Sequence, residues 1–213
     1  MTIGQTSTLN GPNDRVLRQL GSRAWAVVEG WLSHGQLHAL RKQAVQLHRA
    51  AQMLPARVGH GSERKLLPEV RADLIAWITP QQKATPAQLP LWQALERLRV
   101  QLNRTLFLGL KRFEGHFAVY PPGAHYQKHM DQFRDAGHRQ VSFVLFLNPV
   151  WSPQRGGALR LYAQDGEIIS DVLPQWGRAV VFFSDSVPHE VLATRSERFS
   201  FTGWFCDDEE SQR

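Results

Sequence analysis

The second half of the chain is a succession of short apolar segments separated by turn residues. Proline and glycine pairs mark the turns at Pro121–Gly123, Asn148–Pro149 and Gly156–Gly157, and Asp165–Gly166 is typical of a tight hairpin. Many short strands at regular spacing favour a double-sheet jelly roll. We therefore predict a mainly β fold, a double-stranded β-helix whose core covers about residues 113–207.

The first half of the chain has the periodicity of helices. Apolar residues recur at three- and four-residue steps in Leu37–Ala51 and in Leu91–Leu102, and Ser33 precedes the first stripe as a candidate N-cap. We expect these helices to flank the core and to pack on the outside of one sheet. Short apolar segments in Ala24–Leu32 and Arg71–Ile78 are predicted strands.

The length of 213 residues suits one domain with a sizeable core. We predict a flexible N-terminus over residues 1–20, which is polar at its start and lacks the pattern of a signal peptide, followed by a single domain over residues 21–213. No apolar run is long enough to span a bilayer. The lone cysteine, Cys206, excludes a disulfide framework within the chain and a cysteine zinc cluster. Together these features predict a cytoplasmic protein without a membrane partner.

The net charge of +6 is compatible with an acidic partner or a nucleic acid. However, the lysines and arginines are scattered, and no strand combines basic with aromatic residues in the manner of a nucleic-acid platform. We therefore interpret the charge as a solvated basic surface and do not expect a nucleic-acid partner.

One histidine and one carboxylate stand two positions apart, at His129 and Asp131. On an extended segment both point to the same side and can reach one metal, although such a pair alone often occurs by chance. His189, at the start of another predicted strand, supplies a second imidazole. Two histidines and a carboxylate occupy one face of an octahedron and leave other positions open, which is the facial triad of non-haem iron(II) oxygenases. We predict that these three residues bind catalytic Fe(II).

A basic residue follows at a spacing that completes this pattern. Arg198 lies nine residues after His189, on the next predicted strand, and a guanidinium grips a carboxylate with two parallel hydrogen bonds. The co-substrate 2-oxoglutarate has a free distal carboxylate, while its other end chelates iron. Thr202 projects to the same face as Arg198 and adds a hydroxyl. The order of His129, Asp131, His189 and Arg198 along the chain therefore predicts a 2-oxoglutarate-dependent oxygenase.

Further segments match a known family over most of the chain. The matching segments are Arg71–Ile78, Tyr120–Gly123, Arg139, Leu147–Asn148, Trp151, Gly156–Arg160, Pro188–Val191 and Trp204–Phe205. In these segments the chain resembles the prolyl hydroxylase-domain oxygenases, the family of the hypoxia-factor prolyl hydroxylases and their bacterial relatives.

The resemblance implies a dioxygenase that uses Fe(II), 2-oxoglutarate and dioxygen, with ascorbate as a candidate reductant. It implies hydroxylation of a prolyl residue in a protein or peptide, with release of succinate and carbon dioxide. A translation GTPase such as elongation factor Tu is a candidate target by family analogy.

The resemblance also implies roles for individual residues. Asp73 and Arg139 would form an ion pair that helps to hold the substrate, Trp77 would brace that region, and Met53–Arg71 would be a mobile flap over a bound peptide. The residues implied to line the co-substrate pocket with Arg198 are Tyr120, Leu159, Val191, Thr202 and Trp204.

The chain departs from the family pattern at Phe146. Hypoxia-type members carry a tyrosine there that helps to bind the distal carboxylate, whereas phenylalanine has no hydrogen-bond donor. Arg198 remains, so the expected co-substrate is unchanged, but the other donors must differ. Tyr120 and Thr202 are the candidates, and His116 is a further residue expected to point into the pocket.

Other functions remain open from the sequence. The same residues would serve an oxygenase that hydroxylates another amino-acid residue, a free amino acid or an alkylated base. A non-catalytic jelly-roll module that senses oxygen or iron by binding metal is an alternative of a different class. The retention of His129, Asp131, His189 and Arg198 together favours an enzyme, because a sensor has no need of a co-substrate anchor.

Overall fold

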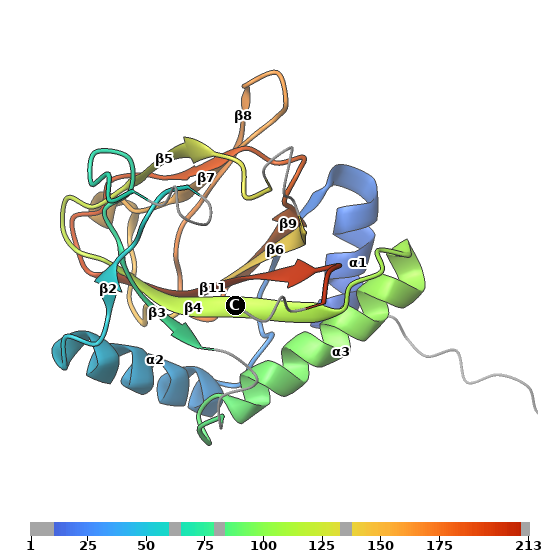
Figure 1. Ribbon diagram of the computed structural model, residues 1–213, viewed down its shortest axis with the longest axis horizontal. Coiled ribbons are helices and arrows are strands. Elements are labelled where there is room, and N and C mark those ends of the chain that lie inside the picture. Colours follow the sequence, from blue (N-terminus) through green and yellow to red (C-terminus); the bar gives the residue numbers. More distant parts are fainter. Residues whose placement is uncertain (1–10, 60–64, 79–83, 133–137, 210–213) are drawn as a thin grey trace, which may run out of the picture.

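The computed structural model describes residues 11–59, 65–78, 84–132 and 138–209. Within these ranges two antiparallel sheets face each other, with helices on one side (Figure 1). The larger sheet has the order β1 (Trp25–Val28), β9 (Ala179–Phe183), β6 (Arg139–Phe146), β11 (Arg198–Cys206), β4 (Arg112–Tyr120), β3 (Leu74–Ile78) and β2 (Leu54–Pro55). The smaller sheet has the order β5 (Tyr126–His129), β10 (His189–Val191), β7 (Leu159–Tyr162) and β8 (Ile168–Val172). This arrangement confirms the predicted mainly β fold with flanking helices.

The helices α2 (His34–Arg49) and α3 (Leu89–Leu106) cover the face of the larger sheet that is turned away from the smaller sheet (Figure 1). Alternation along β11 explains this layering, since successive residues of a strand point to opposite faces. Phe199, Phe201 and Phe205 belong to the core on the helix side. The alternate residues Arg198, Thr202 and Trp204 instead face the space between the sheets. These three were predicted to line the co-substrate pocket.

The first predicted helix starts where its cap was expected. The Ser33 hydroxyl accepts a hydrogen bond from the backbone N–H of Gln36 at 3.3 Å, and the Gln36 side chain accepts one from the backbone N–H of Ser33 at 2.9 Å. This reciprocal pair satisfies two backbone donors at the start of α2. Leu37, Leu40 and Ala44 of the predicted apolar stripe are buried, whereas Leu47 is half-buried and Ala51 lies exposed beyond the end of the helix.

The N-terminal prediction needs a correction. Residues 1–20 were predicted to be flexible, but the structure forms a helix, α1, over Pro12–Arg23. Val16 and Leu20 lie one helical turn apart and are 0% and 2% exposed, because α1 packs against β1 and α3. Apolar burial therefore orders the segment from Pro12 onward, while residues 1–10 lie outside the described part of the chain.

The predicted flap, Met53–Arg71, is described only in part, because residues 60–64 lie outside the described ranges. Its described portion contains the short strand β2 and an antiparallel bridge between Val58 and Lys65. None of the helices in the described ranges is both long and apolar enough to cross a membrane.

Candidate active site

His129, Asp131 and His189 converge at the edge of the space between the sheets. His129 ends β5 and His189 begins β10, and the two residues are direct partners across these antiparallel strands. One carboxylate oxygen of Asp131 lies 3.5 Å from His129 Nε2 and the other lies 3.5 Å from His189 Nε2. The ligand atoms of all three lie within 4.8 Å of one another. Strand pairing thus brings together residues that are distant in the sequence.

Backbone carbonyls orient the two imidazoles. His129 Nδ1 lies 2.7 Å from the carbonyl of Gln127, and His189 Nδ1 lies 3.1 Å from the carbonyl of Val187. If each Nδ1 carries its proton toward the carbonyl, each Nε2 presents a lone pair to the centre of the cluster. This is the arrangement by which proteins fix the tautomer of a metal-binding histidine.

The electrostatics of the cluster also suit a divalent cation. Burial, helped by the neighbouring His129 ring, lowers the pKa of His189 to about 4, so this imidazole is neutral near pH 7. Burial alone would raise the pKa of Asp131, but the His189 and His129 rings and a 2.7 Å hydrogen bond from the Ser142 hydroxyl hold it well below its usual range. Two imidazole nitrogens and one carboxylate fit the donor set that Fe(II) takes in facial-triad sites.

The Ser142 contact was not predicted from the sequence. Ser142 lies on β6, and its hydroxyl also contacts the hydroxyl of Ser184 at 2.8 Å. Both serines are fully buried. The sequence shows only two ordinary serines, and their shared role depends on how the end of β9 lies beside β6.

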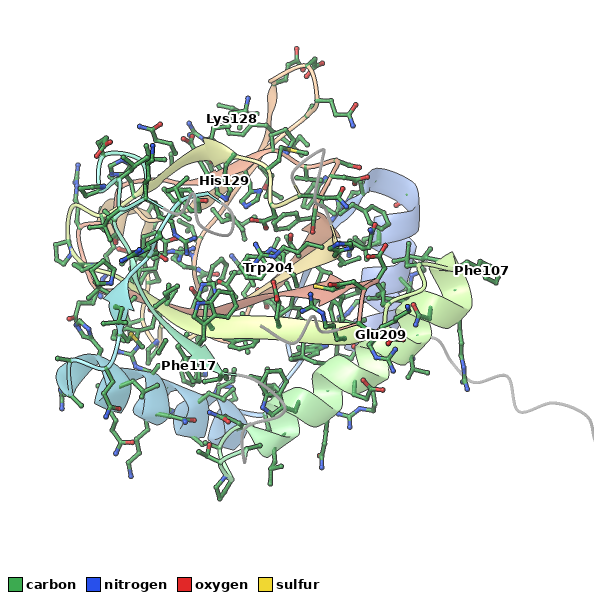
Figure 2. The ribbon with its side chains drawn as sticks, viewed as in Figure 1. Phe107, Phe117, Lys128, His129, Trp204 and Glu209 are labelled. Atoms are coloured by element: carbon green, nitrogen blue, oxygen red, sulfur yellow. The ribbon has the colours of Figure 1, made fainter. Side chains whose placement is uncertain are left out.

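A pocket opens beside the cluster, with a cavity volume of about 70 Å³, which corresponds to roughly five water-sized groups. All residues predicted to bind the co-substrate line it, and so does His116. The lining residues are Arg71, His116, Ala118, Tyr120, Tyr126, His129, Met130, Asp131, Arg139, Val144, Leu159, His189, Val191, Arg198, Thr202 and Trp204. Figure 2 shows His129 on the smaller sheet and Trp204 on the larger one, on opposite sides of the space between the sheets.

Arg198 is buried at the inner end of this pocket, with 1% of its surface exposed. Its Nε donates a 2.8 Å hydrogen bond to the carbonyl of Gly157, and the guanidinium lies about 5 Å from the ring centres of Tyr120 and Phe146. Gly157 has φ +68°, and a Cβ there would lie 3.1 Å from the Arg198 side chain, so only glycine suits this position. Burial lowers the pKa of Arg198 to about 10, and the group remains charged near pH 7.

Three guanidinium groups line the pocket, and they differ in how their charge is balanced. Arg71 forms two hydrogen bonds with Asp73, and Arg139 forms an ion pair with Glu114 at 2.7 Å. Among the described residues, no carboxylate pairs with Arg198. A buried charge without a counterion is costly, so the pocket is built to receive an anion at Arg198.

The predicted ion pair between Asp73 and Arg139 is wrong. Asp73 precedes β3 at the level of Tyr120 and Arg198, whereas Arg139 pairs with Cys206 at the opposite end of β11. Eight residues of strand separate these levels, roughly 26 Å at 3.3 Å per residue. Each side chain therefore pairs with a nearer partner, as described above.

Two further positions refine the prediction. Trp77 does not line the pocket but contacts the ring of His116 at 4.9 Å, and 42% of its surface is exposed. Phe146 is fully buried next to Arg198 and supplies no donor. Ser200, its partner on β11, has a buried hydroxyl without a hydrogen-bond partner among the described residues, so it is a donor candidate that was not predicted.

Comparisons with known proteins agree with this geometry. The profile of the 2OG-Fe(II) oxygenase superfamily matches residues 115–206. A prolyl-4-hydroxylase from Pseudomonas putida is 41% identical, with a TM-score of 0.81, over 91% of this chain and 98% of that one. A prolyl hydroxylase from Trichoplax adhaerens, solved with a hypoxia inducible factor peptide fragment, is 25% identical, with a TM-score of 0.82, over 92% of this chain and 89% of that one.

The human prolyl hydroxylase EGLN3 is 31% identical over 146 residues, which are 66% of this chain and 61% of that protein. The chain thus spans less than two thirds of the length of the first curated relatives it matches. The bacterial structure, in contrast, is matched over nearly its whole length. With the superfamily profile and the shared jelly roll, this shows that the chain belongs to the prolyl hydroxylase family of 2OG-Fe(II) oxygenases.

Proposed function

We propose that this protein is an Fe(II)- and 2-oxoglutarate-dependent dioxygenase that hydroxylates a prolyl residue of a protein substrate and releases succinate and carbon dioxide. The observation that carries the proposal is the buried guanidinium of Arg198, which has no carboxylate partner in the described part of the chain and lies in the same pocket as the His129, Asp131 and His189 cluster. A module that only binds metal would not require this positive charge. An enzyme that binds a co-substrate with a distal carboxylate uses it as the partner of that carboxylate.

In this proposal His129, Asp131 and His189 hold the iron. When bound, iron supplies the activation of dioxygen and the oxidative decarboxylation of the co-substrate that accompany hydroxylation. The contribution of the chain is to orient the imidazoles through their backbone contacts and to keep the carboxylate of Asp131 ionised through Ser142.

Arg198 orients the co-substrate by two parallel hydrogen bonds to its distal carboxylate. Tyr120 and Thr202 line the same pocket and offer hydroxyl groups, and Leu159 and Val191 supply apolar walls that exclude water. Burial strengthens these electrostatic contacts, because the low dielectric of the pocket screens them less than bulk water would.

The protein or peptide nature of the substrate is inferred from the relatives. The Trichoplax enzyme was solved with a peptide, the Pseudomonas protein bears the name prolyl-4-hydroxylase, and human EGLN3 bears the name prolyl hydroxylase. Elongation factor Tu is a candidate target, in line with the resemblance to bacterial members, and we propose the cytoplasm as the place of action. The segment Met53–Arg71 is proposed as the flap over the bound peptide.

Purified protein loaded with Fe(II) tests this proposal in the presence of 2-oxoglutarate, dioxygen and a pool of blocked pentapeptides with proline at the centre and randomised neighbours. We expect succinate and a peptide mass increase of about 16 Da, one oxygen atom, that localises to the proline. The His129→Ala variant should form neither product. Succinate without any modified peptide would remove the prolyl assignment, and no succinate at all would remove the oxygenase assignment. Mass spectrometry of the host proteome with wild type and His129→Ala then identifies the protein target.

A further inference from the structure

Phe107 follows α3 in a conformation and an environment that both disfavour phenylalanine. Its backbone φ is +55°, in the left-handed region where glycine or asparagine usually ends a helix. Its side chain is 87% exposed, more than any other large hydrophobic side chain in the described part of the chain. Figure 2 shows the ring beyond the end of α3, pointing away from the sheets. Neither the backbone nor the core therefore gains from a phenylalanine at this position.

The strained backbone distinguishes Phe107 from other exposed apolar residues. A single exposed apolar side chain is common and needs no explanation by itself. At position 107, however, asparagine would relieve the left-handed backbone and would also remove apolar surface from water. The free protein would therefore be more stable without this ring. A residue with such a penalty persists where another interaction compensates for it, which indicates that the ring makes a contact outside the chain.

The surroundings of Phe107 are basic. Residues 97–113 contain five lysines and arginines and no aspartate or glutamate. Arg104 lies about one turn before Phe107 on α3 and is exposed, and no carboxylate in the described part of the chain pairs with it. On the other side of Phe107, Lys111 meets the exposed Glu209 at 3.7 Å, a loose pair of little energetic weight. An acidic surface on a partner would complement these charges.

The pocket extends along β11 from Arg198 to an end that is open to the surface. Trp204 was predicted to bind the co-substrate, but six residues of β11 separate it from Arg198, roughly 20 Å at 3.3 Å per residue. Arg139 lines the pocket at this second end, and 25% of its side chain is exposed. The pocket therefore reaches the protein surface there.

Phe107 lies near this open end. β4 begins at Arg112, five residues after Phe107, and that stretch of chain spans at most about 18 Å. Arg112 holds Glu114 at 2.9 Å, and Glu114 in turn holds Arg139 of the pocket wall at 2.7 Å. A folded protein whose proline enters the pocket at this end can therefore reach Phe107 with another part of its surface.

We propose that Phe107, with Arg104 and Lys111 beside it, is a docking contact for the folded protein substrate, separate from the pocket that receives the target proline. The surface that it fits is an apolar socket bordered by carboxylates. Aromatic and arginine side chains contribute most to the stability of protein interfaces, and the basic flanks select an acidic border. This inference deepens the proposed function and rests on it, since it requires a protein substrate.

Other occupants fit these observations less well. A second copy of the chain has the same net charge of +6, and a symmetric contact would place Arg104 against its own copy. Stable binding to a lipid surface takes more than one inserted group, but the neighbouring Leu106 and Leu108 pack against the core. Single-stranded nucleic acid stacks on several rings in succession, whereas Phe107 stands between these two leucines.

The Phe107→Asn and Phe107→Tyr variants form a matched pair for testing the contact. Asparagine suits the left-handed backbone but removes the ring, whereas tyrosine keeps both the ring and the strain. Val150→Asn is the control, because Val150 is 69% exposed and follows the end of β6 that is far from the start of β4. Arg104→Glu tests the charge. Its control is Arg195→Glu, at an exposed position just before β11, at the opposite end of that strand from Cys206.

The probes are the folded host protein in which proteome mass spectrometry locates the modified proline, and a synthetic peptide that spans this proline. We expect Phe107→Asn to raise the KM for the folded protein about tenfold, with the KM values for the peptide and for 2-oxoglutarate unaltered. Phe107→Tyr and the two controls should match wild type on both probes. Arg104→Glu should raise the KM for the folded protein in low salt only, because salt screens exposed charges.

Thermal unfolding of the metal-loaded protein separates docking from a structural role. Phe107→Asn should melt at a higher temperature than wild type, because asparagine relieves the left-handed backbone. A lower melting temperature, or an equal rise of the KM for the folded protein and for the peptide, would show that the ring serves the fold or the pocket.

An unaltered KM for the folded protein would show that the ring does not dock the substrate. Co-sedimentation with phosphatidylserine vesicles, binding to a single-stranded oligonucleotide and sedimentation equilibrium would then identify a lipid, a nucleic acid or a second copy as the occupant that Phe107→Asn loses. Each of these results overturns this inference while wild-type hydroxylation of the peptide still supports the proposed function. If wild type modifies no protein and no peptide, the proposed function fails and this inference fails with it.

Discussion

The ring of Tyr126 lies flat against the ring of His129, with ring centres 3.6 Å apart and planes inclined by 18°. The guanidinium of Arg71 covers Tyr126 at 4.6 Å from its ring centre, and Asp73 holds that guanidinium by two hydrogen bonds of 2.6 and 2.9 Å. The backbone adds a bridge between Arg71 and Tyr126. These contacts join the end of the proposed flap to a proposed iron ligand.

We predict that Tyr126→Leu weakens metal binding about tenfold, because outer contacts that orient a metal-binding histidine contribute about this much to affinity. Tyr126→Phe keeps the stacked ring and should bind like wild type. Anaerobic titration calorimetry with Mn(II) measures the difference without catalysis. Equal affinities for the leucine and phenylalanine variants would contradict an orienting role of the stack.

We predict that Arg198→Leu raises the KM for 2-oxoglutarate by about a hundredfold or more, because two charge-assisted hydrogen bonds are lost. Arg198→Lys keeps the charge but not the planar fork, so its KM should fall between those of wild type and the leucine variant. Steady-state rates of succinate formation at varied 2-oxoglutarate concentration give the KM values of wild type and the two variants and so check their order. A lysine variant as good as wild type would show that charge alone, without bidentate geometry, anchors the co-substrate.

We predict that Ser200→Ala raises the KM for 2-oxoglutarate about tenfold, since its buried hydroxyl lies beside Phe146 where the family tyrosine is missing. The double variant Ser200→Ala with Phe146→Tyr should recover affinity, because tyrosine restores a donor near Arg198. Ser22→Ala, on the exposed side of α1, is the control, because it makes the same substitution away from the pocket. If Ser200→Ala behaves like this control, the missing donor has to be sought at Tyr120 or Thr202.

We predict a pH-dependent loss of stability in Glu114→Gln. Burial alone would raise the pKa of Glu114, but Arg139 and Arg112 hold it below its usual 4.5. A carboxyl with a lowered folded-state pKa stabilises the protein above its unfolded-state pKa, and this contribution disappears as the pH falls through the folded-state pKa. The variant should be less stable than wild type by about 1 kcal/mol at pH 7, after allowance for partial exposure.

Urea unfolding of the metal-free proteins at pH 7 and at about pH 3 checks this sign. The difference between the two unfolding curves should shrink toward the acidic pH, because Glu114 of the wild type takes up a proton as the pH falls through its lowered pKa. A constant difference at both pH values would mean that the ion pair with Arg139 contributes nothing, and that glutamine destabilises the protein through packing alone.

The sequence by itself determined the class of fold and the identity of the chemical groups. Turn residues and apolar periodicity depend on local backbone preferences, so the strands around Ala179–Phe183 and Arg198–Cys206 and the capped start of α2 were predictable. The spacing of His129 and Asp131 is also local, since an extended segment places both side chains on one side. The prediction of a flexible segment over residues 1–20 was wrong from Pro12 onward, because the order of that part depends on the burial of Val16 and Leu20 against distant elements.

Only the tertiary structure decided which groups meet. Strand register separates Asp73 from Arg139 and gives each another partner, and it places Trp204 at the opposite end of the pocket from Arg198. The contact of Ser142 with Asp131 joins segments that are close only after the sheet has formed. Such pairings are set by long-range packing, in which a shift of one residue turns a side chain to the other face of the sheet, and local patterns in the sequence do not encode that choice.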